Sequence, residues 1–325
     1  MLESNITTEQ FFIVGFPGLL PKYYDLLGTV FFLIYVATLT GNTVFLTLFV
    51  IEQSLQKPMY LIMVNLALCD IGFCTVALPK IISRYWFNAG AISFHLCFFQ
   101  RQLIHYFGTL NSLIMLIMAL DRYVAICFPL RYPMLMTNKV MGLLTGFAWS
   151  TAMISPGITT IMSSQLPFCG PNLILNCYCD TISVNRLACT DTSQYERLSF
   201  SLAMFVLLLP FFLIIVSYIN VIIAVLRSRS TQARLKTFST CVTQICIISI
   251  YYIPRFVVYL TTYIPNIKLN IDSRIALTML YSLMPPVVNP VIYCFRTKEI
   301  RRILNKLFQQ NNAFIQKCKV EAICG

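Results

Sequence analysis

The residue types best suited to chemistry form an adjacent acid and base, Asp121 and Arg122, followed by Tyr123. The stretch before them is uncharged from Gln102 to Leu120, and Arg131 follows shortly after. An apolar segment that ends in charges is typical of a helix reaching a membrane surface. There an ion pair is only partly desolvated and can be broken at moderate cost. The pair is either a reversible switch or a simple anchor for the helix end.

A second polar group lies within apolar stretches. Asp70 is the single charge in the middle of its stretch, and Asn42 and Asn289 occupy two others. A carboxylate in mid-membrane is costly unless it is hydrated or paired, so we expect Asp70 to face both asparagines. Pro290 removes a backbone hydrogen bond and should bend its helix beside them, with Tyr293 one turn further on. The group is either a static polar knot or a switch with two arrangements.

Composition indicates what kind of fold must position these groups. The chain has 325 residues, of which 58% are hydrophobic and 11% charged, which is too apolar for an ordinary soluble domain. A helix needs about 20 apolar residues to cross a bilayer. Such stretches lie at 26–51, 58–82, 94–126, 140–162, 198–226, 236–261 and 274–293. The sequence therefore predicts an all-α membrane protein, a seven-transmembrane helix bundle.

The distribution of charge sets the expected topology. The net charge of +12 could suggest a nucleic-acid partner, but most of the 24 basic residues fall in the loops on one side of the predicted bundle. This positive-inside bias favours membrane lipid and argues against nucleic acid. Residues 1–24 lack the features of a cleavable signal peptide and contain an Asn-x-Thr sequon at Asn5. We expect this segment to be an extracellular, glycosylated tail.

The other end of the chain is expected in the cytoplasm. We assign residues 25–295 to the membrane domain and residues 296–325 to a cytoplasmic segment. That segment begins with a pattern typical of a short amphipathic helix lying on anionic lipid, although a solvated tail is the alternative. Its apolar face is formed by Ile300, Ile303, Leu304, Leu307 and Phe308.

Several functional classes lack their signatures. The chain contains neither His-Glu-x-x-His nor Gly-x-Ser-x-Gly, so we expect no enzyme activity, no cofactor and no bound metal. An odd number of spans and the lack of an internal repeat count against transporters built from inverted halves. A transport or channel protein nevertheless stays as the rival from another class.

The cysteines expected on the exported side are candidates for disulfide bonds, because that compartment is oxidising. They are Cys97, Cys169, Cys177, Cys179 and Cys189. Their spacing alone does not choose among the possible pairings.

One string is specific enough to indicate a family. Met118-Ala-Leu-Asp-Arg-Tyr-Val-Ala-Ile-Cys-Phe-Pro-Leu-Arg-Tyr132 closely resembles the inner end of the third helix in olfactory receptors, a branch of the rhodopsin-like G-protein-coupled receptors. Other motifs follow in the same order, namely Gly41-Asn42, Lys57-Pro-Met-Tyr60, Lys236-Thr-Phe-Ser-Thr-Cys241 and Pro285-Pro-Val-Val-Asn-Pro-Val-Ile-Tyr293. The resemblance implies an odorant receptor in the plasma membrane of olfactory cilia. It also implies activation of a stimulatory heterotrimeric G protein and cyclic AMP signalling. A non-olfactory chemosensory receptor is the alternative.

The resemblance also implies residue roles. Arg122 would be the coupling residue, held by Asp121 at rest, and the polar group around Asp70 would be the switch. The family pattern pairs Cys97 with Cys179 and Cys169 with Cys189. Two departures from the family matter. Asn111 stands where an acid is usual, which argues against a sodium ion beside Asp70, and Gln244 replaces a common His.

The expected ligand site lies in the outer half of the bundle. His105, Gly108, Thr109 and Ser112 share one face of the third span. The other candidates, on the fifth and sixth spans, are Met204, Phe205, Tyr252, Arg255, Phe256 and Tyr259. Each aromatic residue could instead face lipid or the core.

The charges of the outer half predict the ligand class. Arg101, His105 and Arg255 lie in the outer parts of their spans. Apart from Asp70, which lies deep in the bundle, no acidic residue lies in the outer half of any span. We therefore expect a small ligand that is anionic or a strong hydrogen-bond acceptor. The alternative is that Arg255 extends to the lipid headgroups. Ile104 stands where amine receptors carry an Asp, so the resemblance argues against an amine ligand.

Overall fold

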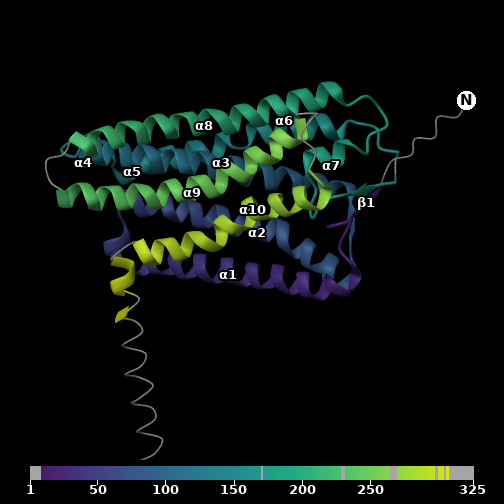
Figure 1. Cartoon of the computed structure of the whole chain (residues 1–325), viewed down its shortest axis with the longest axis horizontal. Helices are drawn as coiled ribbons and strands as arrows, with labels where there is room; N and C mark the ends of the chain where they lie inside the picture. The colour runs from purple at the N-terminus through teal and green to yellow at the C-terminus, as the bar shows by residue number, and fades with distance from the viewer. Residues whose placement is uncertain are drawn as a thin grey trace, which may run out of the picture.

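The computed structural model describes residues 9–169, 171–227, 231–263, 269–296, 299–303 and 305–306. Its long helices run side by side along the length of the molecule, which is an elongated bundle (Figure 1). The bundle helices are α1 (Tyr24–Ile51), α2 (Pro58–Phe87), α3 (Phe94–Cys127), α5 (Asn138–Thr151), α6 (Ile154–Ser164), α8 (Ser193–Arg227), α9 (Thr231–Tyr263) and α10 (Ile271–Arg296). Two shorter helices are α4 (Tyr132–Leu135) and α7 (Thr181–Asn185). The predicted seven-helix membrane bundle is confirmed.

The fourth span is divided between α5 and α6, which corrects the continuous helix expected at 140–162. In the described residues, six single helices are long and apolar enough to cross a membrane, and neither α5 nor α6 is among them. Pro156 explains the break, because it has no N–H to donate to the carbonyl of residue 152, four positions earlier. Helical bonding resumes where the Gly157 N–H donates to the Met153 carbonyl at 2.9 Å.

Local sequence signals fix several helix ends. Pro58 opens α2, where its missing N–H costs nothing. The hydroxyls of Ser93 and Thr137 accept the N–H groups of Leu96 and Val140 and so cap α3 and α5. Asn88 ends α2 with a left-handed backbone, at φ 52°. The observed helix limits therefore lie close to those of the apolar stretches.

A small sheet closes one end of the bundle, here called the sheet end. It consists of β1 (Gln10–Ile13), β2 (Ala91–Ser93) and β3 (Leu173–Ile174). The central strand β1 is antiparallel to β2 and parallel to β3. Phe11 and Ile13 of β1 are buried, at 1% and 0% exposure. This sheet was not predicted, because its strands have only four, three and two residues.

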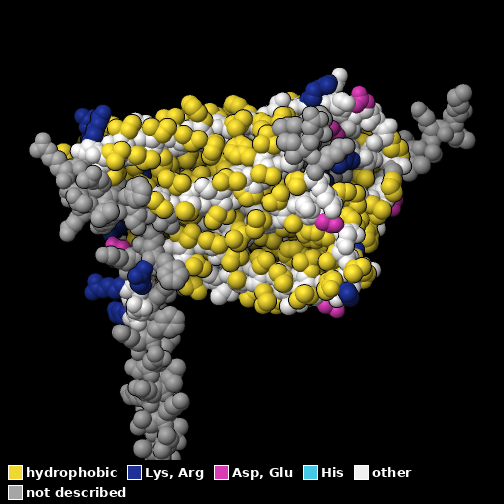
Figure 2. Space-filling view, in the orientation of Figure 1, with side chains coloured by type: hydrophobic (Ala, Val, Ile, Leu, Met, Phe, Trp, Pro, Cys, Tyr) yellow, Lys and Arg dark blue, Asp and Glu magenta, His cyan; other side chains and the backbone are white. Residues whose placement is uncertain are grey.

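The surface between the two ends is apolar. Figure 2 shows a broad hydrophobic belt around the middle of the bundle, with Lys and Arg gathered toward its ends. Leu33, Phe205 and Phe212 are about three-fifths exposed on this belt, at 59%, 62% and 62%. A belt of this extent is incompatible with water and fits the hydrocarbon core of a bilayer.

The opposite end, here called the Asp121 end, holds the start of the C-terminal segment. Residues 299–303 are helical, Ile300 is fully buried and Ile303 packs against the core. The Tyr60 hydroxyl donates to Glu299 at 3.4 Å and ties this segment to α2. Leu304, Leu307 and Phe308 of the predicted amphipathic helix lie outside the described residues, as does Asn5.

Candidate functional site

A cavity of about 130 Å³ lies at the sheet end between α3, α6, α8, α9 and α10. Residues 176–182, here called the cavity loop, contribute Asn176, Tyr178, Asp180, Thr181 and Ile182 to its lining. An engineered protein cavity of about 150 Å³ binds benzene, so this space suits a small organic molecule. Asp70 and Asn111 line it as well, so the cavity extends toward the polar group in the middle of the bundle.

Six predicted ligand-site residues line this cavity. His105, Gly108, Thr109 and Ser112 come from α3, as their shared helical face predicts. Arg255 and Tyr259 come from α9. The polar α3 face is thus brought together with the one charged residue that interrupts the apolar stretch of α9.

The other predicted ligand-site residues lie elsewhere. Phe205 is 62% exposed on the apolar belt. Met204 and Phe256 pack against a core cluster formed by α3, α8 and α9, and Tyr252 is buried within it. The Tyr252 hydroxyl shares a 2.6 Å hydrogen bond with Ser112. Phe205, Tyr252 and Phe256 therefore do not line the cavity as the sequence predicted.

Helical phase explains this correction. Residues Ala203, Val206 and Leu207 of α8 face the cavity. Each residue turns the helix by about 100°, so positions 204 and 205 point away. On α9 the cavity face is formed by Tyr251, Arg255, Val258 and Tyr259, with the spacing of i, i+4, i+7 and i+8. Tyr252 and Phe256 each lie one step around from that face.

Arg255 turns inward and reaches across the cavity to α3. Its Nη2 lies 3.0 Å from the point that a Cβ on Gly108 would occupy, so a side chain at this position would push the guanidinium back by a few tenths of an ångström. Its Nη1 donates to the Tyr251 hydroxyl, which in turn donates to the Gly108 carbonyl at 2.6 Å. The guanidinium also lies 5.2 and 5.6 Å from the ring centroids of Tyr251 and Tyr281. The alternative in which Arg255 extends to the headgroups does not hold.

Arg101, one of the bases in the outer half of the bundle, does not line the cavity. It is fully buried between α3 and α6. Its Nη2 donates to the Thr159 carbonyl and to Ser163 Oγ, both at 2.9 Å. Its ring neighbour is Phe98, whose centroid lies 5.5 Å from the guanidinium carbon.

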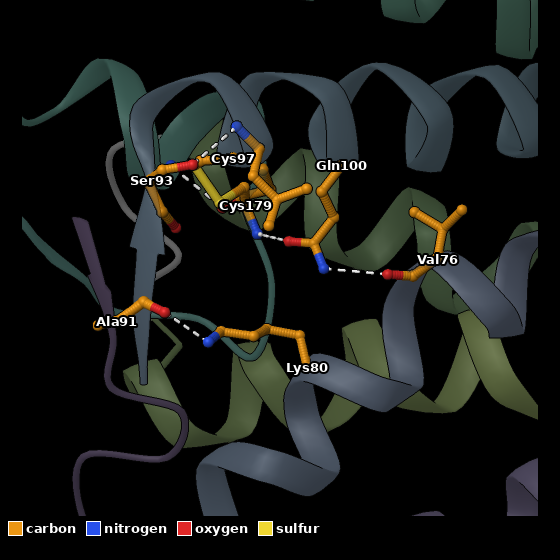
Figure 3. Close-up of a disulfide and its surroundings, with 10 residues drawn as sticks. Val76, Lys80, Ala91, Ser93, Cys97, Gln100 and Cys179 are labelled. Atoms are coloured by element: carbon orange, nitrogen blue, oxygen red, sulfur yellow. Dashed lines mark hydrogen bonds between the residues drawn. A yellow bond between two sulfur atoms is a disulfide. The ribbon is translucent and has the colours of Figure 1, made fainter. Parts of the chain in front are cut away.

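The cavity loop is tied to α3 at Cys179. Cys97 is bridged to Cys179, and a second disulfide joins Cys169 to Cys189, the same pairing that the resemblance implies. Figure 3 shows Gln100 beside the first bridge. Its Oε1 accepts the Cys179 N–H at 3.1 Å, and its Nε2 donates to the Val76 carbonyl of α2 at 3.1 Å. The loop is therefore anchored to two helices.

Two further hydrogen bonds hold the cavity loop over the cavity. Thr181 Oγ1 bonds His105 Nε2 at 2.9 Å, and the hydroxyls of Tyr178 and Ser282 are 3.5 Å apart. Cys177 is buried and unbridged, and burial raises the pKa of its thiol to about 12. At neutral pH this thiol is therefore uncharged and unreactive.

Asp180 of the cavity loop was missed by the sequence reasoning. The ligand class was predicted from charges inside the spans alone, and Asp180 lies in the loop after α6. The available signal was its position directly after Cys179, the cysteine that the resemblance bridges to α3. A residue next to such a bridge must lie close to the outer half of that helix.

At the Asp121 end, the acid and base are paired loosely. Arg122 Nε lies 3.9 Å from Asp121 Oδ2, and the exposures of the two side chains are 15% and 1%. Asp121 has a second partner that the sequence did not reveal, because the Tyr132 hydroxyl donates to its Oδ1 at 2.9 Å. Asp121 therefore binds the first residue of α4 in addition to pairing with Arg122.

The polar group in mid-bundle is arranged differently from the expectation. Asn289 donates to Asp70 at 2.8 Å, as predicted. Asn42 instead donates to the Pro286 carbonyl at 3.1 Å. Pro290 cannot supply an N–H to that carbonyl, four residues earlier, and Asn42 replaces the missing donor. Tyr293 is buried one turn on, with its ring 5.2 Å from that of Phe45.

Comparison with known proteins decides the family. The sequence model of the olfactory receptor family matches residues 31–311. Human olfactory receptor 2AT4 is 33% identical over 309 residues, which cover 95% of this chain and 96% of that relative. Human olfactory receptors 10A6 and 52D1 are 35% and 36% identical over 308 residues. Those matches cover 95% and 94% of this chain and 97% and 96% of the relatives. The chain belongs to the olfactory receptor family.

As an olfactory receptor, the protein is a multi-pass membrane receptor for odorants and not an enzyme. One departure from the common family sequence has a visible consequence. Gln244, in place of a His, accepts a hydrogen bond from the Tyr218 hydroxyl at 2.7 Å and joins α9 to α8. Because an amide does not titrate, this link between the two helices is insensitive to pH.

Proposed function

We propose that the receptor binds a small odorant in the cavity and then activates a stimulatory heterotrimeric G protein, which raises cyclic AMP. In this proposal the sheet end faces the outside of the plasma membrane, in olfactory cilia by family resemblance, and the Asp121 end faces the cytoplasm. The disulfides at the sheet end support this orientation, because they form in an oxidising compartment. The bias of basic residues toward the other end supports it as well.

The observation that carries the proposal is the continuity between the cavity and the switch residues. The cavity lining includes Asp70, which accepts a hydrogen bond from Asn289 on α10. The lining also includes one face of α3, the helix that carries Asp121 and Arg122 near its C-terminal end. A ligand that prefers one arrangement of these helices shifts the population toward it.

The proposed roles follow from this path. The Asp121–Arg122 pair, with Tyr123, would form the coupling site, and release of Arg122 would expose it to the G protein. The polar group would be the bistable element, and its members are Asn42, Asp70, Asn289, Pro290 and Tyr293. The bend at Pro290 makes two arrangements of α10 accessible, because the local helical hydrogen bond is already missing.

We propose further that the ligand is anionic or a strong hydrogen-bond acceptor. Among the described residues, the only pair of opposite charges within 4.0 Å is Arg122 and Asp121, so Arg255 has no carboxylate partner of its own. A cation that faces a cavity surrounded by tyrosines favours an anion there. The planar guanidinium suits a carboxylate, which it can bind through two parallel hydrogen bonds.

The test is ligand-evoked cyclic AMP in cells with and without the stimulatory G-protein α subunit. A response that persists without ion gradients and vanishes without the G protein supports the proposal, whereas the reverse pattern indicates transport. Arg122→Ala should abolish the response at normal surface expression. Arg131→Ala is the matched control, because Arg131 is exposed in the following loop and should leave the response intact. Full signalling by Arg122→Ala would contradict the assignment.

A further inference from the structure

We infer that the cavity is built for a small carboxylic acid that also carries a hydrogen-bond donor, a hydroxyl or an ammonium group, a few atoms from its carboxylate. The inference rests on the proposed ligand site and adds a second recognition group to it. That group is the carboxylate of Asp180, which lines the same cavity as Arg255 but comes from the cavity loop.

Asp180 is held in place on both sides. The preceding residue, Cys179, is bridged to Cys97, and its N–H is bound by Gln100. The following residue, Thr181, bonds His105 on α3. A loop side chain between two such anchors has a fixed position over the cavity, so it can contribute to recognition without a large loss of conformational entropy.

The Asp180 carboxylate accepts few hydrogen bonds from the protein itself. Its Oδ1 accepts the Ser183 N–H at 3.3 Å, where it caps α7. No Lys, Arg or His in the described part of the chain lies within 4.0 Å of it. Arg101 interacts with it electrostatically, but only from beyond that distance. A half-buried carboxylate beside a cavity, with no cation in contact, favours a ligand that donates a hydrogen bond.

The two charges act on the same space without neutralising each other. Asp180 and Arg255 both interact electrostatically with His105, Tyr178 and Tyr281, all of which line the cavity. Yet they are not within ion-pair distance of each other. A ligand placed between them can give its carboxylate to Arg255 and its donor to Asp180. An acid without a donor would place an apolar group against the Asp180 carboxylate. An amine without a carboxylate would place its positive charge against the Arg255 guanidinium.

The remaining charge favours an acid over an amine as the primary group. Arg274 of α10 also lines the cavity, so apart from Asp70, which Asn289 binds, the charges of the lining are two guanidiniums and one loop carboxylate. The volume of about 130 Å³ limits the ligand to roughly the size of benzene. Short hydroxy acids and amino acids meet both conditions.

Three probes with the same number of non-hydrogen atoms test the inference: butanoate, 3-hydroxypropanoate and 3-aminopropanoate. They share the carboxylate and differ only in ending in a methyl, hydroxyl or ammonium group. The affinity of each probe is measured on the purified full-length receptor in lipid nanodiscs, without the G protein. The readout is the rise in melting temperature as the probe concentration increases. We expect the hydroxy or the amino acid to bind roughly tenfold more tightly than butanoate, because its donor pairs with a charged acceptor.

Asp180→Asn removes the charge and keeps the helix cap, because Asn caps as well as Asp. It should reduce that preference to less than about threefold and leave butanoate affinity unchanged. Asp191→Asn, at an exposed loop aspartate, is the matched control and should keep the preference. Arg255→Gln should weaken all three probes.

Several results would overturn the inference. Butanoate binding as tightly as both other probes would do so, as would no binding of any probe, or a preference that survives in Asp180→Asn. These outcomes are separable from the proposed function. A cyclic AMP response to butanoate without any preference leaves the function standing and removes the inference. The expected binding pattern without any cyclic AMP response supports the inference and contradicts the proposed coupling.

Discussion

Two arginines, one on α3 and one on α9, have opposite surroundings. Arg101 is sealed between α3 and α6 and donates to two oxygens of α6, the Thr159 carbonyl and Ser163 Oγ. Arg255 faces a cavity, and its partners are tyrosines that are themselves arranged around that cavity. What separates them is the kind of partner: Arg101 donates through Nη2 to two oxygens of the chain, whereas we propose that Arg255 donates to a ligand.

This difference determines what each side chain should contribute. A buried cation is tolerated only where hydrogen bonds compensate for its lost hydration. Removing Arg101 leaves polar oxygens of α6 without their partner and a void between two helices, so the folded state loses stability. Removing Arg255 ends its hydrogen bond to Tyr251 at the cavity wall and takes away the proposed partner of the ligand carboxylate, so we expect ligand affinity to fall. Substitutions at four positions test this difference between the two arginines.

Arg255→Ala should lower the potency of a carboxylate agonist by roughly 10- to 150-fold, the range for a lost hydrogen bond to a charged group. Arg255→Lys should lose nearly as much, because an ammonium lacks the planar fork. Both variants should reach the cell surface normally. Dose–response curves for cyclic AMP, corrected for surface expression, provide the measurement. An unchanged curve for Arg255→Ala would eliminate the proposed contact with the carboxylate.

Arg101→Ala should lower the free energy of unfolding by about 1–3 kcal/mol, through lost hydrogen bonds and packing. We expect less receptor at the surface and a lower melting temperature in nanodiscs. The potency of the agonist at the receptors that do reach the surface should stay the same. A potency loss as large as that of Arg255→Ala would show that Arg101 contributes to ligand binding and not only to stability.

Gly108→Ala tests the close approach of Arg255 to α3. The new methyl group would lie 3.0 Å from Arg255 Nη2 and would displace the guanidinium, so potency should fall by roughly tenfold. Gly142→Ala is the matched control, because nothing lies within 4 Å of its Cβ position. Equal potency for Gly108→Ala and the wild type would show that the guanidinium need not lie against α3.

Phe205→Ala should have the smallest effect. Phe205 is 62% exposed on the apolar belt and does not line the cavity. Replacement of a surface side chain usually changes stability by less than about 0.5 kcal/mol, and agonist potency should be unchanged. A marked loss of potency would place the ligand outside the cavity, against the belt face of α8.

The sequence predicted the fold well because the signal for it is strong. Apolar stretches of membrane length mark the helices, and Asp121–Arg122 marks where α3 ends. The polar face of α3 was also predictable, since His105, Thr109 and Ser112 repeat with helical spacing in an otherwise apolar stretch.

Other features could not be read from the sequence. The region of α8 around Met204 and Phe205 is apolar on every side, so no periodicity shows which face turns inward. The direction of Arg101 depends on α6, whose start at the Pro156 break sets where Thr159 and Ser163 lie. The place of Asp180 depends on a disulfide and on tertiary contacts of its neighbours. The path of Arg255 depends on Gly108, on a different helix.

The central claim is that Arg255 receives the carboxylate of the ligand inside the cavity. An experimental structure of the receptor with the most potent acid of the probe series tests this most directly. We predict carboxylate oxygens about 2.7–2.9 Å from the guanidinium nitrogens of Arg255, with Gly108 beside them. A carboxylate bound elsewhere, with Arg255 turned toward the lipid headgroups, would contradict it.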